Sequence, residues 1–238
     1  ELGGKSPSIV FSDANEDWVV EGIIAAMRFT RQSQSCTAGS RLFIHEDIFD
    51  EFLEKLKFKL SKLKIGNPLD EETDIGTIIN KKQYDKVCSY IKEGLENENS
   101  TLICGGLPPL EGELSKGYFT LPTIFSNISN SWRLAKEEIF GPVLVAIKWK
   151  NEQDVINMAN ESHYGLAAYL WTKDLTKAIN MANKIESGWI QINQGLGQVP
   201  GHSYGGFKQS GLGKEFSLEG MLDSYTQKKN ITINLKLP

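Results

Sequence analysis

The feature that most constrains this chain is the alternation of short apolar segments with longer amphipathic ones. Each apolar segment has the length of a strand, and each amphipathic one repeats its apolar residues at helical spacing. The strand-like segments are 8–11, 40–46, 100–106, 118–125, 142–149, 166–172 and 187–193, and the helical ones are 12–31, 47–63, 81–96, 151–162 and 174–185. This alternation predicts an α/β fold with a mostly parallel sheet, covered by helices on both faces.

The first helix is predicted to span residues 12–31. Ser12 or Asp13 would be its N-cap, because their side chains accept hydrogen bonds from the first-turn N–H groups. Acidic residues follow in the first turn, where the helix dipole favours them.

Two stretches near the C-terminus break the alternation. Residues 193–215 hold seven of the 22 glycines and are predicted to form a loop. The tail from residue 221 to 238 alternates apolar side chains at Tyr225, Ile231, Ile233 and Leu235. It is predicted to be an edge strand that pairs with another subunit.

Composition narrows the classes of partner. A net charge of −4 and a pI near 5.5 argue against nucleic acid, which favours a basic surface. No apolar run reaches transmembrane length, so no membrane partner is expected. The 3 cysteines lack metal-ligand spacing, which predicts no metal site and favours a reducing, cytoplasmic location.

Cys36 is the first candidate for a catalytic residue. It lies in "RQSQSCTAGSR" (31–41), where small and polar neighbours leave room for a substrate carbonyl to approach the sulfur. The alternative is a small core residue, which is the common role of a lone cysteine. Cys88 and Cys104 lie in apolar segments and are interpreted as core residues.

Several motifs together resemble the catalytic region of the aldehyde dehydrogenase superfamily, close to its betaine-aldehyde and semialdehyde members. In order along the chain they are "ELGGKSP" (1–7), "QSC" (34–36), "KEEIFGPV" (136–143), "YGLAAYLWT" (164–172), "GWIQIN" (188–193) and "YGGFKQSGLGKE" (204–215). The resemblance implies the family's three-layer catalytic domain over residues 1–220 and an oligomerisation strand over 221–238. It also implies a separate NAD(P)-binding domain that would lie upstream of Glu1.

The resemblance assigns the chemistry to two residues. Cys36 matches the nucleophile that attacks the aldehyde, forming a thiohemiacetal that is oxidised to a thioester with NAD or NADP as hydride acceptor. Glu1 matches the general base that activates the hydrolytic water. A thiol with an ordinary pKa of about 8.5 needs activation near neutral pH, and a carboxylate can accept a proton from the thiol or from water.

The resemblance also implies binding roles. Glu138 and Phe140 match the residues that hold the nicotinamide ribose and face the nicotinamide region. Tyr204 matches a substrate-pocket aromatic, and His202 is expected to contact substrate rather than act as an acid or base. The expected substrate is a small or polar aldehyde, and the expected assembly a homodimer or homotetramer.

Two local features depart from the family pattern. Cys36 follows Glu1 by 35 residues, one more than the common spacing, and Ser33 replaces a usual glycine. There is also no GxGxxG turn after a strand. The chain is therefore expected to be a truncated catalytic region, inactive as a dehydrogenase without its cofactor domain.

Three other readings stay open. The chain could be a non-catalytic assembly module of the same fold. It could belong to the CoA-acylating branch, although the "ELGGK" glutamate favours hydrolysis. A thiol hydrolase would need a histidine partner for Cys36, and His45, His163 and His202 lie in no recognisable motif.

Overall fold

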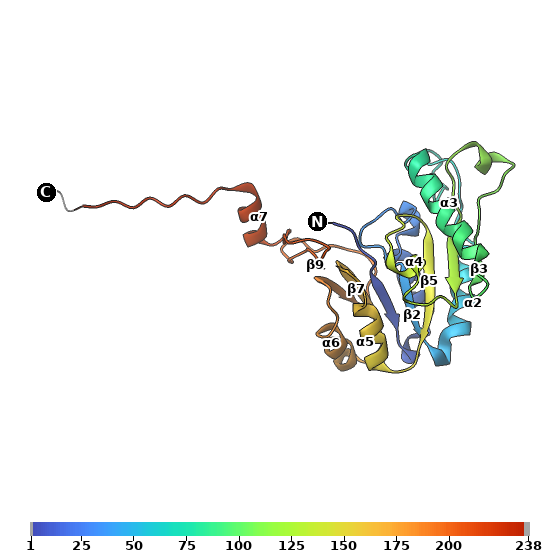
Figure 1. Cartoon of the computed structure of the whole chain (residues 1–238), viewed down its shortest axis with the longest axis horizontal. Coiled ribbons are helices and arrows are strands. Elements are labelled where there is room, and N and C mark those ends of the chain that lie inside the picture. The colour runs from blue at the N-terminus through green and yellow to red at the C-terminus, as the bar shows by residue number, and fades with distance from the viewer. Residues whose placement is uncertain (1, 236–238) are drawn as a thin grey trace.

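The computed structural model describes residues 2–235 and centres on a seven-stranded sheet (Figure 1). In spatial order the strands are β3 (Thr101–Cys104), β4 (Thr123–Ser126), β5 (Val143–Trp149), β2 (Arg41–His45), β1 (Pro7–Val10), β7 (Ala167–Trp171) and β8 (Trp189–Ile192). Every neighbouring pair is parallel except β3 with β4. The predicted mostly parallel sheet is confirmed.

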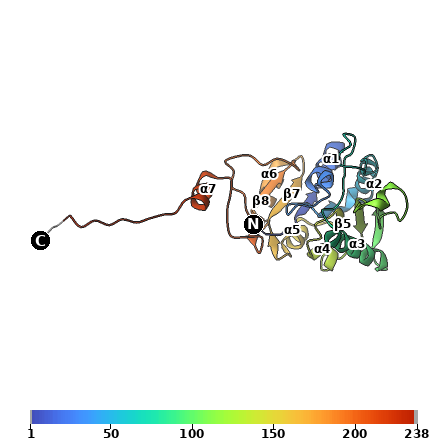
Figure 2. The ribbon, with the colours of Figure 1, turned by 90° about the horizontal axis from the view of Figure 1, so that it is seen from above.

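Helices cover both faces of this sheet. The core of one face includes α1 (Asp17–Ala26) and α2 (Phe49–Leu60). The core of the other includes α3 (Lys81–Glu96), α5 (Glu152–Asn160) and α6 (Leu175–Ala182). Figure 2 shows α1 and α2 on the side opposite α3 and the short α4 (Arg133–Lys136).

Because successive side chains of a strand point to opposite faces, the sheet contributes residues to both hydrophobic cores. In β1, Ile9 packs with the α3 side and Val10 with the α1 side, and Phe43 and Ile44 divide in the same way in β2. Because the central strands are buried on both faces, their sequences are mostly apolar, with Ser8 in β1 and Arg41 in β2 as buried polar exceptions. The three-layer architecture follows from this pattern.

The prediction of one helix over 12–31 is wrong at both ends. Residues Ser12–Ala14 form a 3-10 turn (η1), and Asp13 accepts hydrogen bonds from the Thr172 hydroxyl and the Lys173 N–H instead of capping a helix. At the other end, Arg28 adopts a left-handed conformation with φ of 60°, which stops the helix. A second 3-10 turn, η2, follows over Phe29–Arg31.

Other boundaries differ by a few residues. The strand predicted over 118–125 begins only at Thr123, since Pro122 has no N–H for a ladder. Short 3-10 turns occur at Glu46–Ile48 (η3) and Glu113–Lys116 (η4). None of the helices within residues 2–235 is both long and apolar enough to span a bilayer.

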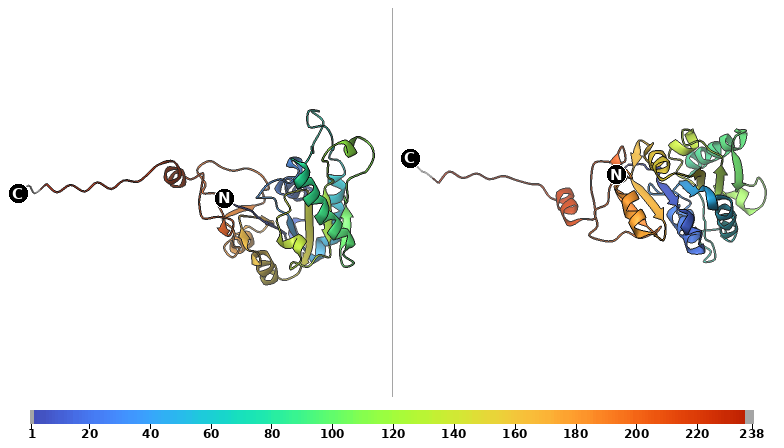
Figure 3. Two further views of the ribbon diagram at one scale, coloured as in Figure 1. Left: turned by 45° about the horizontal axis from the view of Figure 1, so that its top comes forward. Right: turned by 90° about the horizontal axis from the view of Figure 1, so that it is seen from below.

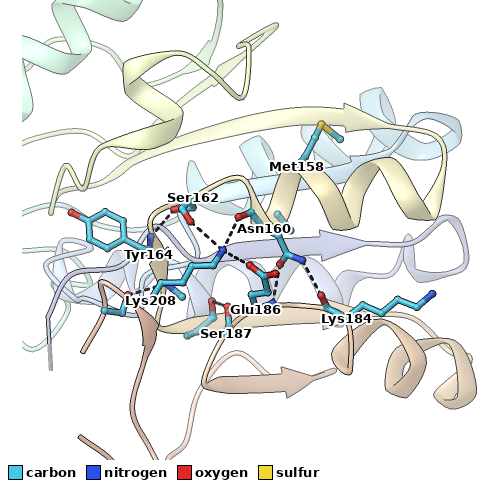
Figure 4. Close-up of polar contacts among 12 residues, drawn as sticks. Met158, Asn160, Ser162, Tyr164, Lys184, Glu186, Ser187 and Lys208 are labelled. Carbon is cyan, nitrogen blue, oxygen red and sulfur yellow. Dashed lines mark hydrogen bonds and ion pairs between the residues drawn. The ribbon is translucent and has the colours of Figure 1, made fainter. Parts of the chain in front are cut away.

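The glycine-rich loop is held to the body by a short two-stranded sheet. Within it, β9 (Phe207–Lys208) pairs antiparallel with β6 (Tyr164–Gly165). The Lys208 ammonium donates to the carbonyl oxygens of Asn160 (2.7 Å) and Ser162 (3.1 Å) and pairs with Glu186 at 2.5 Å (Figure 4). This cluster ties the loop to the end of α5.

The C-terminal region projects away from the body, as Figures 1 and 3 show. It begins with a helix not expected from the sequence, α7 (Leu218–Tyr225), whose N-cap Ser217 accepts a hydrogen bond from the Gly220 N–H at 3.1 Å. Tyr225 therefore ends a helix rather than starting a strand. Residues 226–235 form no strand within the described chain, so the oligomerisation strand stays a prediction.

Candidate functional site

Cys36 lies on an irregular loop between η2 and β2. The loop turns sharply through Gln32 and Ser33, whose φ angles are 53° and 52°. After Cys36 the loop is fixed by a hydrogen bond, in which the Tyr169 hydroxyl donates to the Thr37 carbonyl at 2.8 Å. A buried tyrosine of the central sheet thus holds the residue next to the thiol.

Cys36 borders an open cavity of about 410 Å³. The Tyr204 hydroxyl lies 4.0 Å from the Cys36 sulfur, across this cavity. The Tyr204 ring is buried between Trp189 and Phe216, with edge-on contacts at centroid distances of 5.4 and 5.6 Å. Two predicted site residues, separated by 168 positions in sequence, therefore share one cavity.

The segment after residue 1 passes between the cysteine loop and Glu138. A β-carbon on Gly4 would lie 2.2 Å from the Cys36 carbonyl oxygen, and one on Gly3 would lie 2.9 Å from a Glu138 carboxylate oxygen. The Gly4 N–H donates to the other Glu138 oxygen at 2.9 Å. Only glycine fits at position 4, where the clash is with backbone, whereas a side chain at position 3 would displace the Glu138 carboxylate.

Phe140 is held in a strained conformation beside Glu138. Its φ is 60°, uncommon for a bulky residue. The Gln83 side chain donates to the carbonyl oxygens of Ile139 (2.8 Å) and Phe140 (2.9 Å), which fixes the turn. Strain of this kind persists where surrounding structure enforces it, often at ligand sites.

The geometry fits the cofactor role expected of Glu138. Its carboxylate is half-buried and fixed by the Gly4 N–H, yet each oxygen has further lone pairs for hydroxyl donors. A fixed carboxylate beside a half-buried aromatic can hold a ribose diol and a flat ring.

The remaining predicted residues are placed as follows. His202 is exposed on the glycine-rich loop and is not among the residues that line the Cys36 cavity. Glu1 lies outside the described residues. Its neighbours are held by Ser210, whose hydroxyl donates to the Gly3 carbonyl at 2.7 Å and whose own carbonyl accepts from the Leu2 N–H at 2.9 Å.

The other two cysteines are poor nucleophiles. Burial raises the pKa of the Cys104 thiol to about 11. Burial also raises the pKa of Cys88, although the Tyr84 hydroxyl partly offsets this. Because thiolates are the reactive form, neither thiol is suited to catalysis.

Comparison with known proteins shows the family to which this chain belongs. A sequence profile of the aldehyde dehydrogenase family matches residues 1–231. The chain belongs to the aldehyde dehydrogenase family. It is 44% identical over 237 residues to hydroxyisobutyraldehyde dehydrogenase from Mycolicibacterium austroafricanum, covering 99% of this chain and 46% of that protein. The chain thus spans about half the length of the curated relatives it matches.

Solved aldehyde dehydrogenases share the fold. The NAD+ complex of the Bacillus cereus enzyme is 37% identical, with a TM-score of 0.91 over 99% of this chain and 47% of that one. Betaine aldehyde dehydrogenase from Staphylococcus aureus, also with NAD+, is 37% identical, with a TM-score of 0.88 over 94% of this chain and 44% of that one. The aldehyde dehydrogenase type of three-layer domain is therefore confirmed.

The structure adds cavity residues that were not named as site residues from the sequence. Arg28 and Arg31 enter from the segment before the nucleophile, and Glu215 and Phe216 from the end of the glycine-rich loop. The available signal was the pair of arginines in an otherwise apolar helical stretch. This signal could not be used, because the helix expected over 12–31 would place both arginines on the surface of that helix and not on a segment beside the cavity.

Proposed function

We propose that the protein containing this chain oxidises an aldehyde to a carboxylic acid with NAD or NADP, using Cys36 as nucleophile. The observation that carries the proposal is the half-buried Cys36 thiol at the edge of an open cavity that Tyr204 also lines. The Cys36 loop packs against the Gly4 segment, whose N–H binds Glu138. Family membership supports oxidation of aldehydes in general.

The chain's own groups would act in sequence. The Cys36 sulfur attacks the aldehyde carbon, and the thiol proton passes to Glu1 or to solvent. Loss of hydride from the resulting thiohemiacetal leaves a thioester on Cys36. Glu1 then removes a proton from the water that attacks this thioester, and the carboxylic acid leaves as the Cys36 thiol is restored.

The cofactor would contact this chain at few positions. Glu138 would accept hydrogen bonds from its ribose hydroxyls, and Phe140 would pack against the nicotinamide region. When bound, NAD or NADP supplies the hydride acceptor. Most of its binding is assigned to a separate domain, so we expect the 238-residue chain alone to produce no NAD(P)H from aldehydes.

The proposal is tested in a longer protein in which this chain is joined to its cofactor domain. Cys36→Ser should abolish aldehyde-dependent NAD(P)H formation, whereas Cys88→Ser should leave it within about twofold, because Cys88 lies on α3 away from the cavity. Equal losses in both variants would contradict the assignment of Cys36. A chain that served only as an assembly module would show no activity to lose.

A further inference from the structure

Within residues 2–235, two arginines of the Cys36 cavity have no acidic partner. Arg28 is buried at 7% exposure, and its guanidinium donates to two neutral groups, the carbonyl oxygens of Gly195 (2.7 Å) and Ala25 (3.3 Å). Arg31 is exposed at the cavity edge. Neither forms an ion pair with a carboxylate of residues 2–235. A buried guanidinium without a counter-ion is costly, and such groups are normally paired.

The buried Arg28 and Cys36 line the same cavity. Burial raises the pKa of Tyr169 to about 12, and the nearby Arg28 charge opposes this shift. The same Tyr169 hydroxyl donates to the Thr37 carbonyl, one residue after Cys36. Arg28 therefore acts on the tyrosine whose hydroxyl holds the loop of Cys36.

Negative charge in the described cavity lining is limited to one residue. Among the described lining residues Glu215 is the only carboxylate, and it is exposed at the end of the glycine-rich loop. The rest of the lining from that loop consists of neutral residues, including Leu196, Gln198 and Tyr204. The wall formed by the nucleophile's own segment is thus cationic.

We propose that Arg28 and Arg31 bind a carboxylate on the substrate, so that the site selects short aldehydes with a second, anionic end. A guanidinium matches a carboxylate with two parallel hydrogen bonds. Neutral aldehydes would lose these bonds, and cationic aldehydes would be repelled. The inference rests on the proposed function, since it names the substrate class of the same site.

The first test compares two alkylating agents of nearly the same size, iodoacetate and iodoacetamide, on the 238-residue chain. In both reactions the thiolate sulfur attacks the methylene carbon, a C–S bond forms, the C–I bond breaks and iodide leaves. The iodoacetate-to-iodoacetamide rate ratio is measured by peptide mass spectrometry at Cys36 and, as internal reference, at Cys88. A change in thiol pKa affects both reagents alike, so the ratio reports the charge around each sulfur.

The ratio should be roughly fivefold to tenfold higher at Cys36 than at Cys88, as expected for a charge-assisted contact. Arg31→Gln should lower it at least about twofold, and Arg28→Gln further. Glu215→Gln should raise it. Lys82→Gln, which removes an exposed charge on α3, should leave it unchanged. Arg31 is exposed, so its variant keeps the test valid even if the Arg28 variant does not fold.

The proposal would be overturned if the iodoacetate-to-iodoacetamide ratio were equal at Cys36 and Cys88. It would also be overturned if neither Arg28→Gln nor Arg31→Gln changed the ratio at Cys36. Alkylation requires neither cofactor nor hydride transfer, so failure of dehydrogenase activity cannot cause this result.

The second test uses the protein joined to its cofactor domain. There kcat/KM for succinic semialdehyde should exceed that for butanal at least about tenfold, and Arg31→Gln should reduce this preference. A preference for butanal or betaine aldehyde would also overturn it.

Discussion

Lys5 follows Gly3 and Gly4, the two glycines that pack against Glu138 and Cys36, and is an unusual buried cation. Its side chain is 2% exposed, and its ammonium nitrogen has no hydrogen-bond partner within the described residues. Burial, together with the nearby Arg41 charge, lowers its pKa to about 7, although Glu138 opposes the shift. Near neutral pH the folded chain therefore holds this amine close to its titration point.

This shift predicts a pH-dependent stability. Unfolded Lys5 has an ordinary pKa of about 10.4, so between about pH 7 and pH 10 the unfolded chain binds a proton that the folded chain lacks. Lys5 therefore makes the free energy of unfolding rise with pH across this window, by up to about 1.4 kcal/mol per pH unit, and costs stability below it. Lys5→Met should be more stable than wild type at pH 7, with the difference shrinking towards pH 10.

Urea unfolding at several pH values measures this effect. Lys82→Met is the matched control, because Lys82 is exposed on α3 and should retain the wild-type pH slope. Parallel slopes for wild type and Lys5→Met would show that Lys5 titrates normally in the folded chain.

At the scale of the element, Ser210 joins three segments that are distant in sequence. Its buried hydroxyl accepts from the Gly165 N–H of β6 at 3.0 Å and donates to the Gly3 carbonyl at 2.7 Å. Ser210, in the glycine-rich loop, thus connects the "ELGG" segment to the β6–β9 strand pair by hydrogen bonds. The residues next to Glu1 depend on this serine for their position.

Ser210→Ala should leave both of these backbone groups without their partner. We expect a loss of about 1–3 kcal/mol in the free energy of unfolding, because buried unpaired polar groups carry their full desolvation cost. Hydrogen exchange at the Gly165 amide should also accelerate. Ser115→Ala, which removes an exposed loop hydroxyl, should stay within about 0.5 kcal/mol of wild type. Unchanged exchange at Gly165 would contradict the role of Ser210.

The elements also show what could be predicted from sequence. The helix over 81–96 was predicted at its observed bounds from its amphipathic spacing, and the structure shows that the Asn80 side chain caps it. The helix over 12–31 was not, since the side chain of Asp13 bonds to residues 159 and 160 positions away. Local propensity cannot foresee such long-range partners.

The same distinction applies to the site. Cys36, Glu138 and Tyr204 could be named because they lie in motifs, although their functional roles remain predictions. Arg28 and Arg31 could not, because their place in the cavity depends on a left-handed residue at position 28 and on a loop from residues 193–216. Ser33 is a related case. It replaces a glycine usual in the family, and its φ of 52° explains why glycine would be favoured there.

At the scale of the whole molecule, the C-terminal region presents apolar surface with no cover. Leu222 is 51% exposed on α7, and Ile231 and Ile233 are 73% and 71% exposed on the extended segment. Figures 2 and 3 show this segment leaving the body in every view. Extended backbone with alternating apolar side chains is suited to pairing with a sheet edge of another copy.

We therefore predict that the chain self-associates through α7 and residues 226–235. Size-exclusion chromatography with light scattering should give a dimer or larger species for the wild type. Ile231→Glu combined with Ile233→Glu should shift it towards monomer, because burying two charges in an apolar interface is costly. Leu175→Glu, which changes an equally exposed apolar side chain (65%) on α6, should leave the assembly intact. A wild-type monomer at high concentration would contradict self-association and would mean that this surface is covered by a different partner. Equal effects of the double variant and of Leu175→Glu would show that residues 226–235 do not form the interface.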